Sequence, residues 1–158
     1  MEKPLSSAAY KAEVERKGVI AFVPNGVSMW PILKNHGQSV VVEKKTSRLK
    51  KYDVAFYARE SGACVLHRVM EVTDDGYVMC GDSQFTLERV KEEQVFGVMT
   101  GFYKKDEYVP ADSEKYLKKV EKYYKRKLLR KIRIKGFMFV WRVKNKLKSI
   151  FKKGKKNV

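Results

Sequence analysis

The sequence predicts a mainly β domain that coils into a barrel-like shape and is followed by a basic helical extension. Between residues 19 and 110, short segments rich in β-branched and aromatic residues alternate with Gly, Pro, Asn and Asp turns. After residue 110, apolar residues recur at near-helical spacing among many lysines and arginines. The chain is therefore expected to divide into an N-terminal helical segment (1–18), a β-rich domain (19–110) and a basic amphipathic helical tail (111–158).

The expected elements are short and are separated by turn signals. Ser6 or Ser7 can cap a first helix that runs through Arg16 and stops at Gly18. Strands are expected where β-branched and aromatic residues cluster between turn residues. They cover residues 19–23, 39–43, 54–57, 63–72, 77–81 and 95–102.

An Asp-Gly pair between the fourth and fifth expected strands is a strong hairpin signal. With Asp75 and Gly76 as a two-residue turn, the register makes Asp82 a diagonal neighbour of His67 on the same face of the sheet. A loop of three residues would move Asp82 to the opposite face. Contact between His67 and Asp82 therefore requires the two-residue turn, or a bulge with the same effect.

The net charge lies entirely in the C-terminal part of the chain. Residues 113–158 hold 19 Lys and Arg against two acids, which equals the +17 of the whole chain, so the basic pI describes the tail. Two cysteines, Cys64 and Cys80, are too few for a disulfide framework and favour a reducing compartment. No apolar run approaches the ~20 residues that cross a bilayer. We expect no membrane anchor, and a location in the cytoplasm or at the inner face of the membrane.

Three motifs supply, in order, the groups of nucleophilic catalysis: Ser28 in Gly-Val-Ser-Met-Trp-Pro, His67 in His-Arg-Val, and Asp82 in Gly-Asp. A serine hydroxyl becomes a nucleophile when a neighbouring base takes its proton. Histidine suits that task because its unperturbed pKa is near ~6.5. A carboxylate behind the imidazole fixes its tautomer. Each residue alone has a structural reading as a turn serine, a buried strand histidine or a turn acid, but the ordered set favours catalysis.

In this order the motifs resemble the signal peptidase I superfamily, which also includes the LexA-like self-cleaving peptidases. His67 is similar to the endoplasmic-reticulum subtype, since bacterial-type members carry lysine there. The resemblance covers roughly residues 18–103, including the run from Leu49 to Val54, which is similar to the family's Leu-Lys-x-Gly-Asp-Val. It implies a coiled β peptidase fold and a serine endopeptidase that cleaves a peptide or precursor protein, with no cofactor and no metal. Ser28 would be the nucleophile, and His67 the general base and then the general acid.

Two acids compete for the third catalytic place. Strand geometry favours Asp82, which also matches the family's Gly-Asp. Glu88 comes six residues later, where endoplasmic-reticulum-type members carry another acid, and is the second candidate. A charge in a solvated loop is the alternative explanation of Glu88.

The oxyanion hole is expected at the turn around Ser28, whose backbone N–H would be one donor. Many members of the family place a second donor, a serine hydroxyl, where this chain has Gly26, so Asn25 or a backbone N–H would have to substitute. Met29 is expected to shape the turn and the floor of the pocket. Trp30 is a candidate contact for peptide or membrane, with packing as its alternative.

The missing hydroxyl at Gly26 supports a second hypothesis, a non-catalytic peptide-binding relative that is tethered through its tail to membrane or nucleic acid. The tail itself has the character of a basic amphipathic helix with aromatic residues such as Phe137 and Trp141. Such a helix binds an anionic membrane surface or a partner, or packs its apolar stripe on its own β domain. Nucleic acid ranks behind these, because no recognition motif accompanies the charge. The sequence leaves the oligomeric state open.

Overall fold

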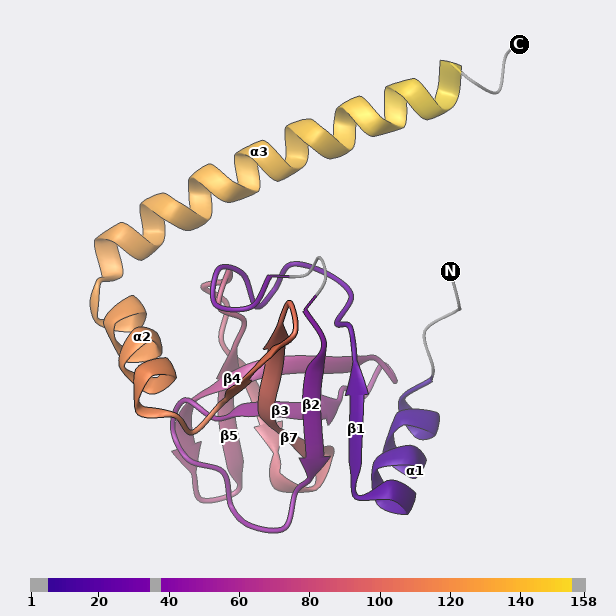
Figure 1. The fold of residues 1–158 in the computed structure, drawn as a ribbon, viewed down its shortest axis with the longest axis vertical. Coiled ribbons are helices and arrows are strands. Elements are labelled where there is room, and N and C mark those ends of the chain that lie inside the picture. Colours follow the sequence, from indigo (N-terminus) through magenta and orange to yellow (C-terminus); the bar gives the residue numbers. More distant parts are fainter. Residues whose placement is uncertain (1–5, 35–37, 155–158) are drawn as a thin grey trace. The chain divides into compact units, whose positions relative to one another are not determined.

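The computed structural model describes residues 6–34 and 38–154, so expectations that fall on residues 1–5, 35–37 and 155–158 lie outside the described residues. The described part contains one antiparallel sheet of eight strands, with one helix before it and two after it (Figure 1). The elements are α1 (Ser7–Lys17), β1 (Val19–Phe22), β2 (Val40–Lys44), β3 (Val54–Ala58), β4 (Cys64–Thr73), β5 (Gly76–Cys80), β6 (Glu88–Lys91), the 3-10 turn η1 (Glu92–Gln94), β7 (Val95–Lys104), β8 (Glu107–Pro110), α2 (Glu114–Lys125) and α3 (Lys127–Gly154).

The mainly β fold class is confirmed. The strands follow the order β1-β2-β7-β3-β4-β5-β6, and β8 adds to β7 as a further partner. The pairing path of the described strands begins at β1 and ends at β6 without returning to β1, so the sheet is open. The chain divides into two compact units between Glu121 and Lys122, inside α2. The first unit, called the β unit below, contains α1, the sheet and the first turns of α2.

Helix α1 begins and ends where its capping residues predict. Ser6 accepts a hydrogen bond from the backbone of Ala9 at 3.2 Å, which satisfies one of the open N–H groups of the first turn. Gly18 ends the helix with φ of 75°, a left-handed conformation that glycine adopts without steric cost. The ring of Tyr10 packs against Phe22 and Phe56, both at 5.4 Å between centroids, and fixes the helix to the sheet.

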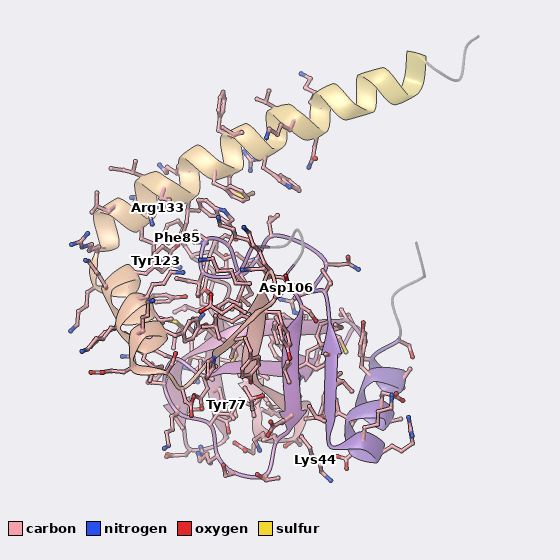
Figure 2. All side chains as sticks on the ribbon, in the orientation of Figure 1. Lys44, Tyr77, Phe85, Asp106, Tyr123 and Arg133 are labelled. Carbon is pink, nitrogen blue, oxygen red and sulfur yellow. The ribbon has the colours of Figure 1, made fainter. Side chains whose placement is uncertain are left out.

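Strand β3 lies in the interior, because β4 and β7 pair with its two edges. Ala55 and Tyr57 belong to a buried cluster that also contains Val69, Tyr77 and Met79. Tyr77 (labelled in Figure 2) accepts a hydrogen bond from the backbone of Leu49 at 3.1 Å, so its polar end is satisfied inside this core. The cluster supports the middle of β4 and therefore the segment that carries His67.

The predicted β4–β5 register is wrong. Gly76 does not lie in the turn: it is the first residue of β5 and pairs with Thr73, so the turn is Asp74–Asp75. Glycine is needed there because a Cβ would lie 2.2 Å from the carbonyl oxygen of Val90 on β6. A second shift follows at a bulge in β4 between Val69 and Glu71, which changes the register again before the strand reaches His67.

The sequence also failed to indicate β6 and β8. Both strands are four residues long and largely polar, and only Val90 of β6 is buried. Helices α2 and α3 cover most of the predicted basic tail, although Tyr116 and Val120 of α2 are buried core residues of the β unit. Within residues 6–34 and 38–154, no helix is long and apolar enough to span a membrane.

Candidate active site

The loop that carries Ser28 is bound to the end of β5. Ser83 donates from its backbone N–H to the carbonyl oxygen of Ser28 and from its hydroxyl to that of Val27, both at 2.8 Å. A Cβ on Gly81 would lie 2.8 Å from the same Ser28 oxygen. Glycine at position 81 therefore permits the close approach of the two backbones, and the Ser28 side chain is half-buried.

His67 lies on β4, where its backbone pairs with Ala55 of β3. On the other edge Arg68 pairs with Cys80, so one further step of the antiparallel register places His67 opposite Gly81. Ser28 and His67 are thus both neighbours of Gly81, although 39 positions separate them in the sequence. Among the described side chains no hydrogen bond joins the Ser28 hydroxyl to His67, whose Nδ1 is hydrogen-bonded to Tyr57.

On the Nδ1 side of its ring, His67 is connected to a carboxylate through a tyrosine. The Nδ1 atom of His67 lies 3.2 Å from the hydroxyl oxygen of Tyr57, which in turn lies 2.9 Å from Oε2 of Glu88. The direct distance between His67 Nδ1 and Glu88 Oε2 is 3.9 Å. Arg59 holds the same carboxylate with two hydrogen bonds, from Nε at 2.7 Å and from Nη2 at 2.6 Å.

This arrangement fixes the tautomer of His67. An ionised carboxylate only accepts hydrogen bonds, so the single proton of the Tyr57 hydroxyl is donated to Glu88. The phenol oxygen must then accept from His67, which places the imidazole proton on Nδ1 and leaves the lone pair on Nε2. An unprotonated Nε2 is the form that a general base requires.

The charges around the ring favour the neutral imidazole. Burial, followed by the positive charge of Arg59, lowers the pKa of His67 to about 4, against the opposing effect of Glu88. The hydrogen bonds from Arg59 hold the pKa of Glu88 below its usual value, so this acid is ionised. Burial and the bond to Glu88 raise the pKa of Tyr57, which keeps its proton. At neutral pH the three groups are therefore a carboxylate, a phenol and a neutral imidazole.

Asp82, the preferred third member, is not placed beside His67. Its two carboxylate oxygens bind Arg68, from Nε and Nη2, both at 2.8 Å, and both side chains are fully buried. Arg68 also donates to the carbonyl of Tyr52 and to the hydroxyl of Tyr116. Arg68 and His67 are adjacent on one strand and so point to opposite faces. The bulge in β4 accounts for the error, because one extra residue transfers Asp82 from the face of His67 to that of Arg68.

Glu88, the second candidate, is the acid that lies nearest to Nδ1 among the contacts described above. It is the first residue of β6 and not part of a solvated loop. Its carboxylate is partly buried and fully engaged by Tyr57 and Arg59. The structure thus brings Glu88, and not Asp82, into the hydrogen-bonded series that includes His67.

The turn before Ser28 leaves the second oxyanion donor unassigned. Gly26 has φ of 96°, and a Cβ there would meet nothing within 4 Å, so backbone conformation and not space explains the glycine. Asn25 is exposed, while Met29 is buried and its carbonyl accepts from Leu33 at 2.9 Å, as expected for a residue that shapes the turn. Trp30 is half-buried and precedes a cis proline.

Sequence reasoning missed Tyr57 and Arg59 on the β3–β4 hairpin and Ser83 after β5. The signal for the first pair is the Ser-Gly turn at residues 61 and 62. That turn marks a hairpin but not its register: a two-residue turn there would pair Ala58 with Val65, whereas the structure pairs Ala58 with Cys64 and so makes Tyr57 a diagonal neighbour of His67. No comparable signal marks Ser83.

Comparison with protein-family models, with curated proteins and with solved structures finds no match for the chain. In the part of the chain that the structure describes, no group of three or more His, Cys, Asp or Glu side chains is arranged to hold a metal ion.

Proposed function

We propose that this chain is a serine endopeptidase in which Ser28 is the nucleophile and His67 the general base. Tyr57 and Glu88 orient His67. The observation that carries the proposal is the hydrogen-bonded series from Glu88 through Tyr57 to His67 Nδ1, which leaves Nε2 available on the remaining side of the ring. The order of the motifs, with its resemblance to signal peptidase I and LexA-like peptidases of the Ser-His subtype, supports the same assignment and a coiled β peptidase fold.

In the first step, the Ser28 oxygen attacks the carbonyl carbon of a peptide bond while its proton passes to His67 Nε2. The imidazolium that forms is stabilised through its Nδ1–H bond to Tyr57 and by the negative charge of Glu88, 3.9 Å away. Catalytic hydrogen bonds are often long in free enzymes and shorten when substrate binds. Closure of Ser28 onto His67 is accordingly assigned to substrate binding.

In the second step, the tetrahedral adduct breaks its C–N bond and His67 returns the proton to the departing amine. A water molecule then gives a proton to Nε2 and attacks the acyl carbon. The bond from that carbon to the Ser28 oxygen breaks, His67 returns the proton to this oxygen, and the acid product leaves. The backbone N–H of Ser28 is the natural donor to the oxyanion in both steps. Since Gly26 supplies no hydroxyl, a donor from the substrate or from Asn25 would complete the hole.

The experiment is cleavage of a diverse peptide mixture by purified protein, read by mass spectrometry. Wild type is compared with Ser28→Ala, His67→Asn and Glu88→Gln. Ser47→Ala is the matched control, because Ser47 is an exposed serine of the same unit with no part in the site. We expect new peptide termini with wild type and with Ser47→Ala, none with Ser28→Ala, and strongly reduced amounts with the other two variants.

Turnover by Ser28→Ala at the rate of wild type would refute the assignment of the nucleophile. Peptides that are retained by wild type and Ser28→Ala alike, and released uncut, would favour the non-catalytic peptide-binding relative instead. The residues that flank the cuts would define the substrate class and would test whether small side chains precede the cut, as the resemblance to signal peptidase I implies.

A further inference from the structure

Helix α3 carries an apolar stripe that the described structure leaves exposed to solvent. Its members, called the exposed stripe below, are Leu129, Ile132, Phe139, Val140 and Val143. When the residues are placed around the helix axis at 3.6 residues per turn, these positions and Gly136 fall within an arc of about 100°. No charged residue lies within this arc. Phe139 and Ile132 are 69% and 61% exposed, so α3 and the rest of its own unit do not bury the exposed stripe.

Basic residues border the exposed stripe along both sides. Arg133 (labelled in Figure 2) and Lys144 follow one edge, and Lys135 and Lys146 follow the other. Over its 28 residues α3 has 11 Lys and Arg and no acid. Long basic side chains at the border of an apolar face can extend their charged ends toward a polar layer while their stems cover apolar surface.

The charge decides between the candidate partners. A second copy of α3 would bring eleven further positive charges against the first, so pairing of two stripes is opposed by repulsion. Nucleic acid would match the charge but would leave the exposed stripe uncovered. An anionic lipid surface matches both features, since its headgroups attract the basic borders and its acyl boundary accepts the apolar residues.

We propose that α3 binds along the surface of an anionic membrane, with the exposed stripe in the boundary between headgroups and acyl chains. The helix then lies in the membrane plane, because the stripe and its basic borders run parallel to the helix axis. Phe137 and Trp141, the contact candidates named from the sequence, fall outside this arc by the same rotation. Phe139 and Val143 take their place as the residues that enter the membrane. This inference does not depend on the proposed peptidase activity.

The test is binding of the full chain to vesicles of phosphatidylcholine with about 30% phosphatidylglycerol, and to vesicles of phosphatidylcholine alone. The stripe variant is Phe139→Ser/Val143→Ser. Its matched control is Phe85→Ser/Val72→Ser, which removes the same two residue types from exposed positions of the β unit. The border variant is Arg133→Gln/Lys144→Gln, and its control, Lys11→Gln/Lys50→Gln, removes equal charge from exposed sites elsewhere.

We expect wild type to bind the anionic vesicles at about 0.1 M salt, to bind neutral vesicles weakly, and to dissociate as salt is raised. The stripe variant should bind about tenfold more weakly or worse, because two large apolar groups no longer leave water. The border variant should lose about tenfold through charge alone, with its stripe intact. Both controls should stay within about twofold of wild type.

Four results would overturn the proposal. One is an absence of binding to anionic vesicles. The second is equal binding by wild type and the stripe variant, which would reduce the interaction to charge alone. The third is a dimer in sedimentation equilibrium that the stripe variant dissolves while vesicles remain unbound, since this would assign the stripe to a second copy. Tighter binding of duplex DNA than of vesicles at the same salt, unchanged in the stripe variant, would likewise reassign α3 to nucleic acid.

Discussion

The low pKa of His67 makes the stability of the β unit depend on pH in a defined direction. Burial and Arg59 lower the pKa to about 4 in the folded protein, whereas the unfolded chain should have the ordinary value of about 6.5. Between about pH 4 and pH 6.5 the unfolded state binds more protons than the folded state. The unfolding free energy is therefore not reduced by His67 above pH 6.5, and it falls as the pH drops from 6.5 toward 4. The shift of about 2.5 pH units corresponds to about 3 kcal/mol.

The perturbation that isolates this effect is His67→Asn. The asparagine amide can still donate to the Tyr57 oxygen from a position close to that of Nδ1, but it does not titrate. The assay is urea unfolding of both proteins from pH 7.5 to pH 4.5, followed by circular dichroism. Over this interval wild type should lose about 2–3 kcal/mol more unfolding free energy than the variant.

Other titrating groups contribute to the pH dependence of both proteins and largely cancel in the comparison. The pKa of Glu88 is lowered mainly by Arg59, so stability from this acid is lost at more acidic pH in wild type and variant alike. Parallel pH profiles for the two proteins would refute the reasoning, because they would mean that His67 titrates at its ordinary pKa and is accessible to water.

Three further predictions concern residues around the site. Tyr57→Phe should lower kcat/KM by about tenfold to a thousandfold, as measured by peptide turnover. This effect is larger than that of losing one hydrogen bond and smaller than that of losing the acid of a catalytic triad. Asp82→Asn should lower the unfolding free energy by about 3–5 kcal/mol, since Arg68 is left buried without its counter-charge, and Arg68→Met/Asp82→Leu should recover most of this loss in urea unfolding. Tyr52 has φ of 78°, so Tyr52→Gly should raise stability by about 1 kcal/mol, and an unchanged midpoint in the same assay would show that ring contacts offset the strain.

Tyr52 occupies the position of the glycine in the signal peptidase I motif that the segment from Leu49 to Val54 resembles. The backbone there forms a tight turn, in which the N–H of Asp53 donates to the carbonyl of Lys50 at 3.1 Å. In a type II β-turn the third residue has a positive φ. Tyr52 therefore has a positive φ that glycine would adopt without steric cost.

Local patterns predicted most of the elements. Ser6 and Gly18 delimit α1 because capping depends on residues close in sequence, and β-branched runs place β2 and β3 within a residue or two. Strand β6 escaped this reasoning because its four residues are mostly charged and owe their conformation to β5. A strand that forms through tertiary pairing leaves little trace in its own composition.

Which acid lies near His67, Asp82 or Glu88, depends on one extra residue in β4. The alternation of apolar and polar side chains along the strand does not reveal this residue. A hairpin without a bulge would put Asp82 on the face of His67, and the sequence gives no reason to expect an extra residue in a run of β-branched and apolar side chains. The bulge between Val69 and Glu71 reverses the alternation, so Asp82 neutralises Arg68 inside the β unit. Glu88 is connected to His67 by hydrogen bonds through Tyr57, because its carboxylate is 3.9 Å from Nδ1 and the phenol bridges the two groups. The same bulge that removes the expected acid from the site therefore makes the tyrosine necessary, and the effect of Tyr57→Phe on turnover measures how far the bridge replaces a direct carboxylate.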